Sequence, residues 1–192
     1  MSKFSKAKYT SSMCQKIATT LARATMRDEM EKRIGTAMLQ QVRMYEQAHN
    51  SHDVEKIITL FTDDVQFETV DEWIITGKEK IRDLAEWEGA LQNHLAFTDL
   101  SVSGDTVTCK AVEDDDLLRL AGFREIRYDS VSVEFQGDLI KKITLRTAEK
   151  DREATSKTFH SMVDWATRER HSEIVKLVSG GKFAYNARNA DG

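Results

Sequence analysis

The chain has 192 residues, of which 40% are hydrophobic and 31% are charged. This is enough for one domain of ordinary size with an extension and a buried core. The net charge of −4 argues against nucleic acid as the main partner, because that partner requires a clustered basic surface. No stretch of the sequence approaches the ~18 apolar residues of a membrane span, so we expect no span.

The two cysteines, Cys14 and Cys109, lie far apart and form no CxxC pair. The sequence therefore indicates neither a disulfide framework nor a zinc site. We expect a reducing compartment, and so a cytoplasmic location.

The first 27 residues contain no Asp or Glu and carry six Lys and Arg residues among Ser and Thr. Met13, Ile17 and Leu21 recur at helical spacing. This composition is typical of an organelle transit peptide, but we favour a helical arm over residues 1–35 that packs on the domain or on a partner subunit. The apolar pattern continues through Met30 and Ile34, which predicts one helix that runs from the arm into the domain.

The central domain, expected over residues 36–148, begins with two helices. The apolar face of the first consists of Met38, Val42, Tyr45 and Ala48. A polar run then ends this helix and places His49 and His52 in a loop, with Asp53 as the N-cap of a short second helix.

Alternating apolar residues predict strands after these helices. We expect them at 65–69, 73–75, 95–102, 106–112, 124–135 and 139–147, with a third helix over 81–91 whose face includes Glu88. Gly104-Asp105 and Gly137-Asp138 suit hairpin turns, since Gly tolerates positive φ. Helices followed by a largely antiparallel sheet indicate an α+β domain.

Three sequence segments carry a family resemblance. The segments YEQAHNSHDVEKIITLFTDDVQFET, GKEKI and VSVEFQGDLIKKITL resemble the nuclear transport factor 2-like superfamily, and EDDDLLRLAGF resembles an uncharacterised branch of it. The superfamily includes ketosteroid isomerases, SnoaL-like polyketide cyclases, limonene epoxide hydrolase-like enzymes and non-enzymatic proteins. The resemblance covers residues 37–147. It implies a cone-shaped, cystatin-like sheet wrapped around a long helix, a deep pocket and a homodimer formed through the outer sheet face.

Tyr45 resembles the tyrosine of ketosteroid isomerases that donates a hydrogen bond to the substrate oxyanion. A second donor would fall near Tyr128–Asp129. Thr69 stands where these enzymes have their aspartate base, and Thr cannot accept a proton at neutral pH. Glu68 is adjacent but points to the opposite face. The alternative for Tyr45 is a buried helix tyrosine whose hydroxyl is already satisfied.

Arg127 and Asp129 share a face with Val131 by period two. If that face points inward, they form the polar end of the pocket and resemble part of the Asp–Arg–Asp arrangement of limonene epoxide hydrolase-like enzymes. Glu113 or Asp99 could supply a third member. The alternative, which we slightly favour, is a solvated strand end, and a bulge would invert the facing.

Trp73, Trp87 and Phe97 are expected in the core or in the pocket wall, where they would contact an apolar ligand. His94 is expected at the end of the third helix, either as a helix-end cation or as an acid–base group. The acidic run 113–116 is better explained as a helix cap than as a cation site. We expect no metal and no cofactor.

The C-terminal extension, residues 149–192, has a helical pattern from 147 to 179 that includes Phe159 and Met162. Gly180-Gly181 is expected to end the helix, and a short strand follows. The extension could cover the pocket mouth or contribute to a dimer.

Two functions remain open. The first is binding of a small apolar or amphipathic molecule, with cofactor-free isomerase, cyclase or hydratase chemistry as the possible activity. The second is a non-catalytic, dimeric protein-interaction module. Catalysis requires a buried carboxyl or histidine with a shifted pKa near Tyr45.

Overall fold

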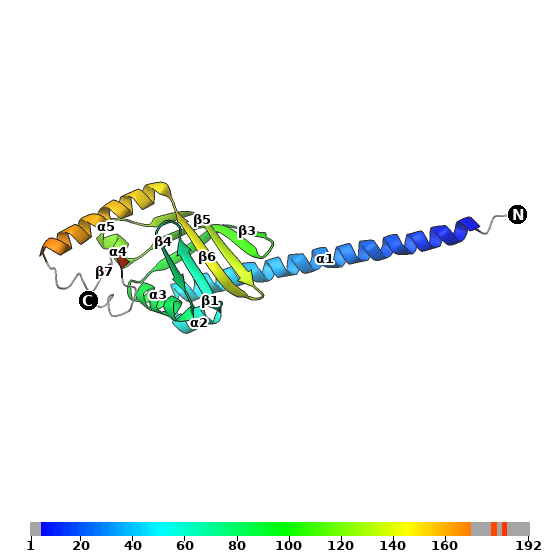
Figure 1. Cartoon of the computed structure of the whole chain (residues 1–192), viewed down its shortest axis with the longest axis horizontal. Coiled ribbons are helices and arrows are strands. Elements are labelled where there is room, and N and C mark those ends of the chain that lie inside the picture. The colour runs from blue at the N-terminus through cyan, green and yellow to red at the C-terminus, as the bar shows by residue number, and fades with distance from the viewer. Residues whose placement is uncertain (1–4, 170–177, 180–181, 184–192) are drawn as a thin grey trace. The chain divides into compact units, whose positions relative to one another are not determined.

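The computed structural model describes residues 5–169, 178–179 and 182–183. The chain divides into two compact units, Met1–Ala37 and Met38–Gly192. The first helix, α1 (Ser5–Asn50), contributes residues to both units (Figure 1). This confirms the prediction that one helix continues from the arm into the domain.

In the part of α1 that belongs to the first unit, the large apolar side chains that the structure describes are exposed. Leu21, Met26, Met30 and Ile34 are all at least 49% exposed. Met38 is the first residue of the chain that belongs to the described core. None of the helices in the described part of the chain is long and apolar enough to cross a membrane.

The second unit contains the end of α1 and four further helices in its described part. They are α2 (Val54–Thr59), α3 (Lys78–Ala90), α4 (Asp116–Leu120) and α5 (Glu149–Glu169). The side chain of Asp53 accepts a hydrogen bond from the backbone N–H of Lys56 at 3.0 Å, which confirms it as the N-cap of α2. Asp115 caps α4 in the same way through the backbone N–H of Leu118 at 2.6 Å.

A mixed sheet forms the larger layer of this unit. Its strands are β1 (Phe61–Thr69), β2 (Trp73–Thr76), β3 (His94–Ser103), β4 (Thr106–Asp114), β5 (Ile126–Gln136) and β6 (Leu139–Thr147). Their spatial order is β2-β1-β6-β5-β4-β3, and β1 and β6 are parallel while all other neighbours are antiparallel. Gly104 and Gly137, at φ values of +62° and +64°, occupy the two expected hairpin turns.

The core lies between the inner face of the sheet and the apolar face of α1 that begins at Met38. Alternate strand residues such as Val131, Val133 and Ile143 are fully buried. The ring of Tyr45 on α1 contacts those of Phe61 and Phe97, with centroids 5.5 and 6.2 Å apart. The expected α+β architecture, a curved sheet around a long helix, is confirmed.

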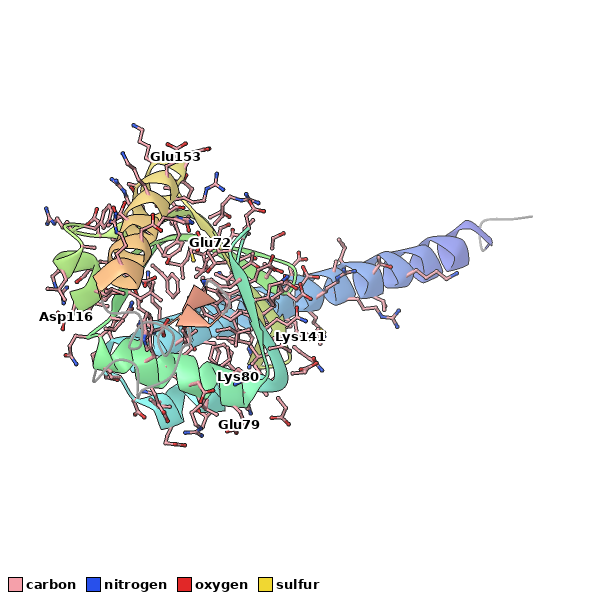
Figure 2. The ribbon with its side chains drawn as sticks, turned by 60° about the vertical axis from the view of Figure 1, so that its left-hand side comes forward. Glu72, Glu79, Lys80, Asp116, Lys141 and Glu153 are labelled. Atoms are coloured by element: carbon pink, nitrogen blue, oxygen red, sulfur yellow. The ribbon has the colours of Figure 1, made fainter. Side chains whose placement is uncertain are left out.

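Charged side chains cover the exterior. Figure 2 shows Glu79, Lys80, Lys141 and Glu153 on the surface, and all four are exposed. The acidic run 113–116 has members on the surface and in the interior. Asp116 is exposed, whereas its neighbour Asp115 is buried. Sequence neighbours in this run therefore differ in their access to water.

The C-terminal extension departs from the expected helix over 147–179. Helix α5 ends at Glu169, and β7 (Val178–Ser179) pairs antiparallel with β8 (Lys182–Phe183). The helix prediction is wrong at 178–179, where cross-strand hydrogen bonds replace helical ones. Residues 170–177, Gly180-Gly181 and the tail from 184 lie outside the described residues.

Candidate functional site

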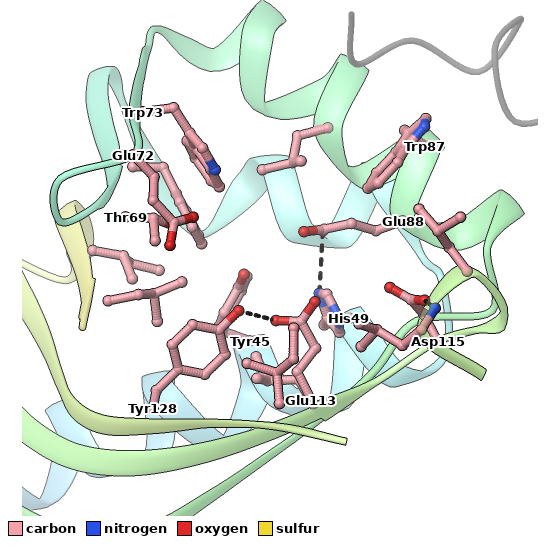
Figure 3. A pocket seen from close by; sticks show the side chains of 18 of the residues that line it. Tyr45, His49, Thr69, Glu72, Trp73, Trp87, Glu88, Glu113, Asp115 and Tyr128 are labelled. Carbon is pink, nitrogen blue, oxygen red and sulfur yellow. Dashed lines mark hydrogen bonds and ion pairs between the residues drawn. The ribbon is translucent and has the colours of Figure 1, made fainter. Parts of the chain in front are cut away.

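A pocket of about 190 Å³ lies between the inner face of the sheet, the end of α1 and helices α3 and α4 (Figure 3). Its wall is largely aromatic. Trp73, Trp87 and Phe97, three of the residues expected at a ligand, lie in this wall. Trp73 stacks on Phe67 with ring centroids 5.6 Å apart. The pocket therefore offers a small molecule an extensive apolar surface.

Tyr45 projects from α1 into the pocket and is only 4% exposed. The structure shows no hydrogen bond from its hydroxyl to another described residue. Burial, together with the charges of Glu88 and Glu113, raises the pKa of Tyr45 well above its ordinary value. The hydroxyl therefore keeps its proton and can donate it in a hydrogen bond to a ligand.

Glu113, at the inner side of β4, accepts two hydrogen bonds. The hydroxyl of Tyr128 donates to its Oε2 at 2.6 Å, and Nδ2 of Asn93 donates to its Oε1 at 2.7 Å. Strand pairing brings the first donor close, because Tyr128 lies opposite Ala111, two residues before the glutamate. Two donors on one carboxyl group fix its orientation.

His49 lies one turn after Tyr45 on α1. Its Nε2 is 2.7 Å from Oδ1 of Asn93, and its Nδ1 is 3.6 Å from Oε2 of Glu88. Because the amide nitrogen of Asn93 donates to Glu113, its oxygen must accept from His49. The proton of the imidazole is therefore on Nε2, and the lone pair of Nδ1 faces Glu88.

Glu88 and Glu113 experience different electrostatic surroundings. Burial, followed by the charge of Glu113, raises the pKa of Glu88 well above its ordinary value. Burial also raises the pKa of Glu113, but the hydrogen bonds from Tyr128 and Asn93 oppose that rise. Burial lowers the pKa of His49 to about 4, so the imidazole is uncharged at neutral pH. Glu88 thus holds a proton more readily than Glu113.

Two further acids border the pocket. Glu72, between β1 and β2, is exposed, whereas Asp115 is buried at the start of α4. Burial raises the pKa of both carboxyl groups. Among the described residues that line the pocket, none is Lys or Arg. No group of three His, Cys, Asp or Glu residues in the described part of the chain could hold a metal ion.

Comparison with known families identifies this architecture. Residues 42–140, just over half of the chain, match the model of a family described as the SnoaL-like domain. The chain belongs to the SnoaL-like domain family. A comparison with curated proteins found no match.

Several solved structures resemble this SnoaL-like domain. One is SalBIII, an epoxide hydrolase/cyclase-like enzyme with a role in pyran ring formation in the polyether salinomycin. It is 16% identical to this chain with a TM-score of 0.53, and the match covers 59% of this chain and 92% of that chain. A candidate ketosteroid isomerase from Kribbella flavida is 19% identical, with a TM-score of 0.51 and coverages of 59% and 79%. A protein of unknown function with a cystatin-like fold from Methylobium petroleophilum is 17% identical, with a TM-score of 0.51 and coverages of 59% and 77%. At such identities the likeness establishes the fold.

In this SnoaL-like domain, Thr69 occupies the place that the isomerase resemblance assigns to the base. It is buried and lines the pocket. Glu68 points to the opposite face of β1, as expected, and its Oε2 binds Nζ of Lys142 at 2.8 Å. A proton acceptor in the pocket must therefore come from another element of the domain.

Arg127 and Asp129 lie outside the pocket, so the inward-facing interpretation of these two residues is wrong and the solvated strand end, which the sequence slightly favoured, describes them. The pairing of β5 with β6 shifts between Tyr128 and Ser130, and the extra residue of this bulge reverses the facing. Tyr128 points inward, whereas Arg127 and Asp129 are exposed. The guanidinium of Arg127 binds the carboxylate of Asp151 on α5 at 3.0 Å.

His94 also lies outside the pocket. Helix α3 ends at Ala90, and His94 is the exposed first residue of β3. The helix-end interpretation is therefore wrong. Asp99 and Glu113 were the candidates for a third member beside Arg127 and Asp129. The carboxylate of Asp99 binds Nζ of Lys110 at 2.9 Å, whereas Glu113 lies in the pocket.

The sequence contained partial signals for the residues that were missed. His49, expected in a loop, belongs to α1, and its spacing of four from Tyr45 already placed both on one helical face. Glu88 shares the apolar face of α3, and Glu113 continues the inward face of β4 by period two. Nothing in the sequence marks Asn93, which is buried in the turn that follows α3.

Proposed function

We propose that the chain is a cofactor-free enzyme that moves a proton within a small organic molecule. Isomerases and cyclases share this chemistry, and hydratases use the same kind of acid–base groups to add water as a second reactant. The observation that supports it best is the pair of carboxyl groups, Glu88 and Glu113, in one aromatic pocket with different surroundings. Surroundings that separate the pKa values of two acids provide a proton donor and an anion at the same pH.

In this proposal Glu88 transfers the proton and Tyr45 donates a hydrogen bond. The minor ionised form of Glu88, which is a strong base because burial raises the pKa of this carboxyl group, takes a proton from a C–H bond next to a carbonyl group. The electron pair of that bond moves onto the carbonyl oxygen, which Tyr45 stabilises. Glu88 then returns the proton to another carbon of the same molecule, so that no oxidant or second reactant is consumed.

Glu113, Tyr128, Asn93 and His49 act as positioning residues. Their hydrogen bonds hold the charge of Glu113 at a fixed place in the pocket. That charge is the largest electrostatic influence on Glu88 after burial. The network therefore sets the proton affinity of the group that performs the chemistry.

Exchange of C–H protons with solvent tests this function without knowledge of the product. The protein is incubated in D₂O with a panel of small ketones and enones, and the loss of C–H signals is followed by NMR. We expect exchange above the buffer rate for at least one compound. Glu88→Gln should slow it by about 10²-fold or more, and Tyr45→Phe by a comparable factor.

Asp129→Asn serves as the control, because Asp129 lies outside the pocket, and it should keep the full exchange rate. Exchange that survives in Glu88→Gln would contradict the assignment of that residue. Ligand binding without exchange of any compound would favour the non-catalytic interaction module instead.

The homodimer and the cellular location stay predictions. Sedimentation of the purified chain tests the dimer, and a monomer at micromolar concentration would contradict it. N-terminal sequencing of protein from its native cells tests targeting. A mature start between Met26 and Glu31 supports a transit peptide, and an intact Ser2 supports the cytoplasmic arm.

A further inference from the structure

We infer that the ligand of this pocket carries a positively charged nitrogen. The inference rests on the proposed function, because it takes the pocket between α1, α3 and the sheet as the ligand site. Four carboxyl groups from different parts of the fold border the cavity. They belong to Glu72, Glu88, Glu113 and Asp115 (Figure 3).

Of the described basic residues, Arg152 acts electrostatically on Glu72, but it does so from outside the lining of the pocket. The described residues that line it include no Lys or Arg. The histidine of the lining, His49, is uncharged at neutral pH because burial lowers its pKa to about 4. An anionic ligand would be repelled by any ionised carboxyl group of this set, whereas a cationic ligand would be attracted to it and would favour its ionised form.

The wall of the pocket suits an organic cation better than a hydrated inorganic one. Phe67, Trp73, Trp87 and Phe97 surround the acids with aromatic carbon. A cation is attracted to the face of an aromatic ring, and the attraction increases when water is excluded. A neutral apolar ligand would use the rings alone and would make no charge interaction with Glu72, the acid of this set that has no other role in the site.

The hydrogen bonds of the acids indicate which of them the ligand contacts. Donors from the protein already occupy Glu113 and Asp115. Glu72 receives one long hydrogen bond, of 3.5 Å, from the hydroxyl of Thr147. We therefore assign the charged nitrogen to Glu72, beside Trp73, and this leaves Glu88 for proton transfer.

A matched pair of ligands tests this inference. Choline and 3,3-dimethyl-1-butanol have the same shape, but a neutral carbon in the alcohol replaces the charged nitrogen of choline. Neither centre has a proton to exchange, so binding does not depend on catalysis. Calorimetric titration of the full chain at ~0.15 M salt, where charges on the exposed surface are screened, should show choline binding at least about tenfold more tightly.

Substitutions locate the contact. Glu72→Gln should weaken choline binding about tenfold and leave binding of the alcohol unchanged. Glu68→Gln is the matched control. Glu68 lies near the end of β1, a few residues before Glu72, but points to the outer face of the sheet, where it binds Lys142. This substitution should change neither affinity. Both residues lie outside the buried core, so both variants are expected to fold.

The outcomes separate this inference from the proposed function. Equal affinity for the two compounds, tighter binding of the alcohol, or no choline binding at millimolar concentration would overturn the inference. Deuterium exchange of neutral ketones could still establish the enzyme in that case. Preference for choline in a protein without any exchange activity would uphold the cation site and reject catalysis.

Discussion

Glu88 is a carboxyl group among aromatic and aliphatic side chains, where little water is present to stabilise its ionised form. Its side chain is 17% exposed, and burial raises its pKa well above the ordinary value of 4.5. In the unfolded chain the same group ionises at that ordinary value. Its protonation state therefore couples the chemistry of the pocket to the stability of the fold.

The free energy of unfolding should fall as the pH rises above about 4.5, the ordinary pKa. Between the two pKa values the folded protein binds more protons than the unfolded chain at this site, so rising pH favours unfolding. The decrease should continue until the pH passes the raised pKa. Glu88→Gln should show a weaker decrease in urea titrations over the same pH series. An identical pH dependence in both proteins would contradict the assignment.

His49 should contribute to stability in the opposite direction. Its folded pKa of about 4 lies below the ordinary value of 6.5, so the unfolded chain binds more protons between these values. Its contribution is complete above 6.5 and is lost as the pH falls through 4. Nitrogen-15 NMR should show the Nε2–H tautomer at neutral pH and a midpoint near 4. A midpoint near 6.5, or a proton on Nδ1, would refute the proposed hydrogen-bond network.

At the scale of single elements, the helices and turns could be predicted because their signals are local. The face of α1 that contains Met38 and Val42 follows a period of 3.6 residues, and all of its predicted members are buried. The capping role of Asp53 depends on residues within one turn. Such features require no knowledge of how distant segments pair.

The N-cap at Asp53 gives a direct test of such a local signal. Asp53→Ala removes the acceptor of the Lys56 backbone N–H and should lower the free energy of unfolding by about 1 kcal/mol. Urea denaturation measures the change. Asp64→Ala, at an exposed strand residue, is the control and should stay within about 0.5 kcal/mol of the original protein. Equal losses in the two variants would argue against a specific cap.

The facing of β5 could not be predicted from its own residues. The alternation from Arg127 through Val131 looks regular, yet the bulge beside Asp129 inverts it. A bulge is determined by pairing with both neighbouring strands, β4 and β6, which are distant along the chain. The bulge therefore explains why the side chain of Tyr128, and not that of Asp129, lines the pocket.

At the scale of the whole molecule, the pocket depends on contacts that cross the sequence. Its polar residues come from α1, α3, β1, β4 and β5, from the turn between β1 and β2, and from the N-cap of α4. The parallel pairing of β1 with β6 brings the first and last strands of the sheet together. Residue types and helical faces thus predicted several wall residues, whereas the partners of Glu113 emerged only from tertiary pairing.

All described core residues belong to the second unit, which predicts that the first unit is dispensable for folding. Removal of residues 2–35 should change the thermal midpoint by less than about 2 °C, because the large apolar side chains described in that segment, from Leu21 to Ile34, are exposed. Circular dichroism melting measures this. A loss of about 10 °C or more would show that the arm stabilises the domain.

The amide of Asn93 has a consequence for how protons move through the protein. It accepts from His49 through oxygen and donates to Glu113 through nitrogen, and a carboxamide has no pKa near neutrality at which it could pass a proton between them. Asn93 therefore transmits polarisation but blocks proton conduction. Glu88 and Glu113 influence each other through their charges but exchange no proton through Asn93, so a proton taken up by Glu88 must leave through the ligand or the solvent.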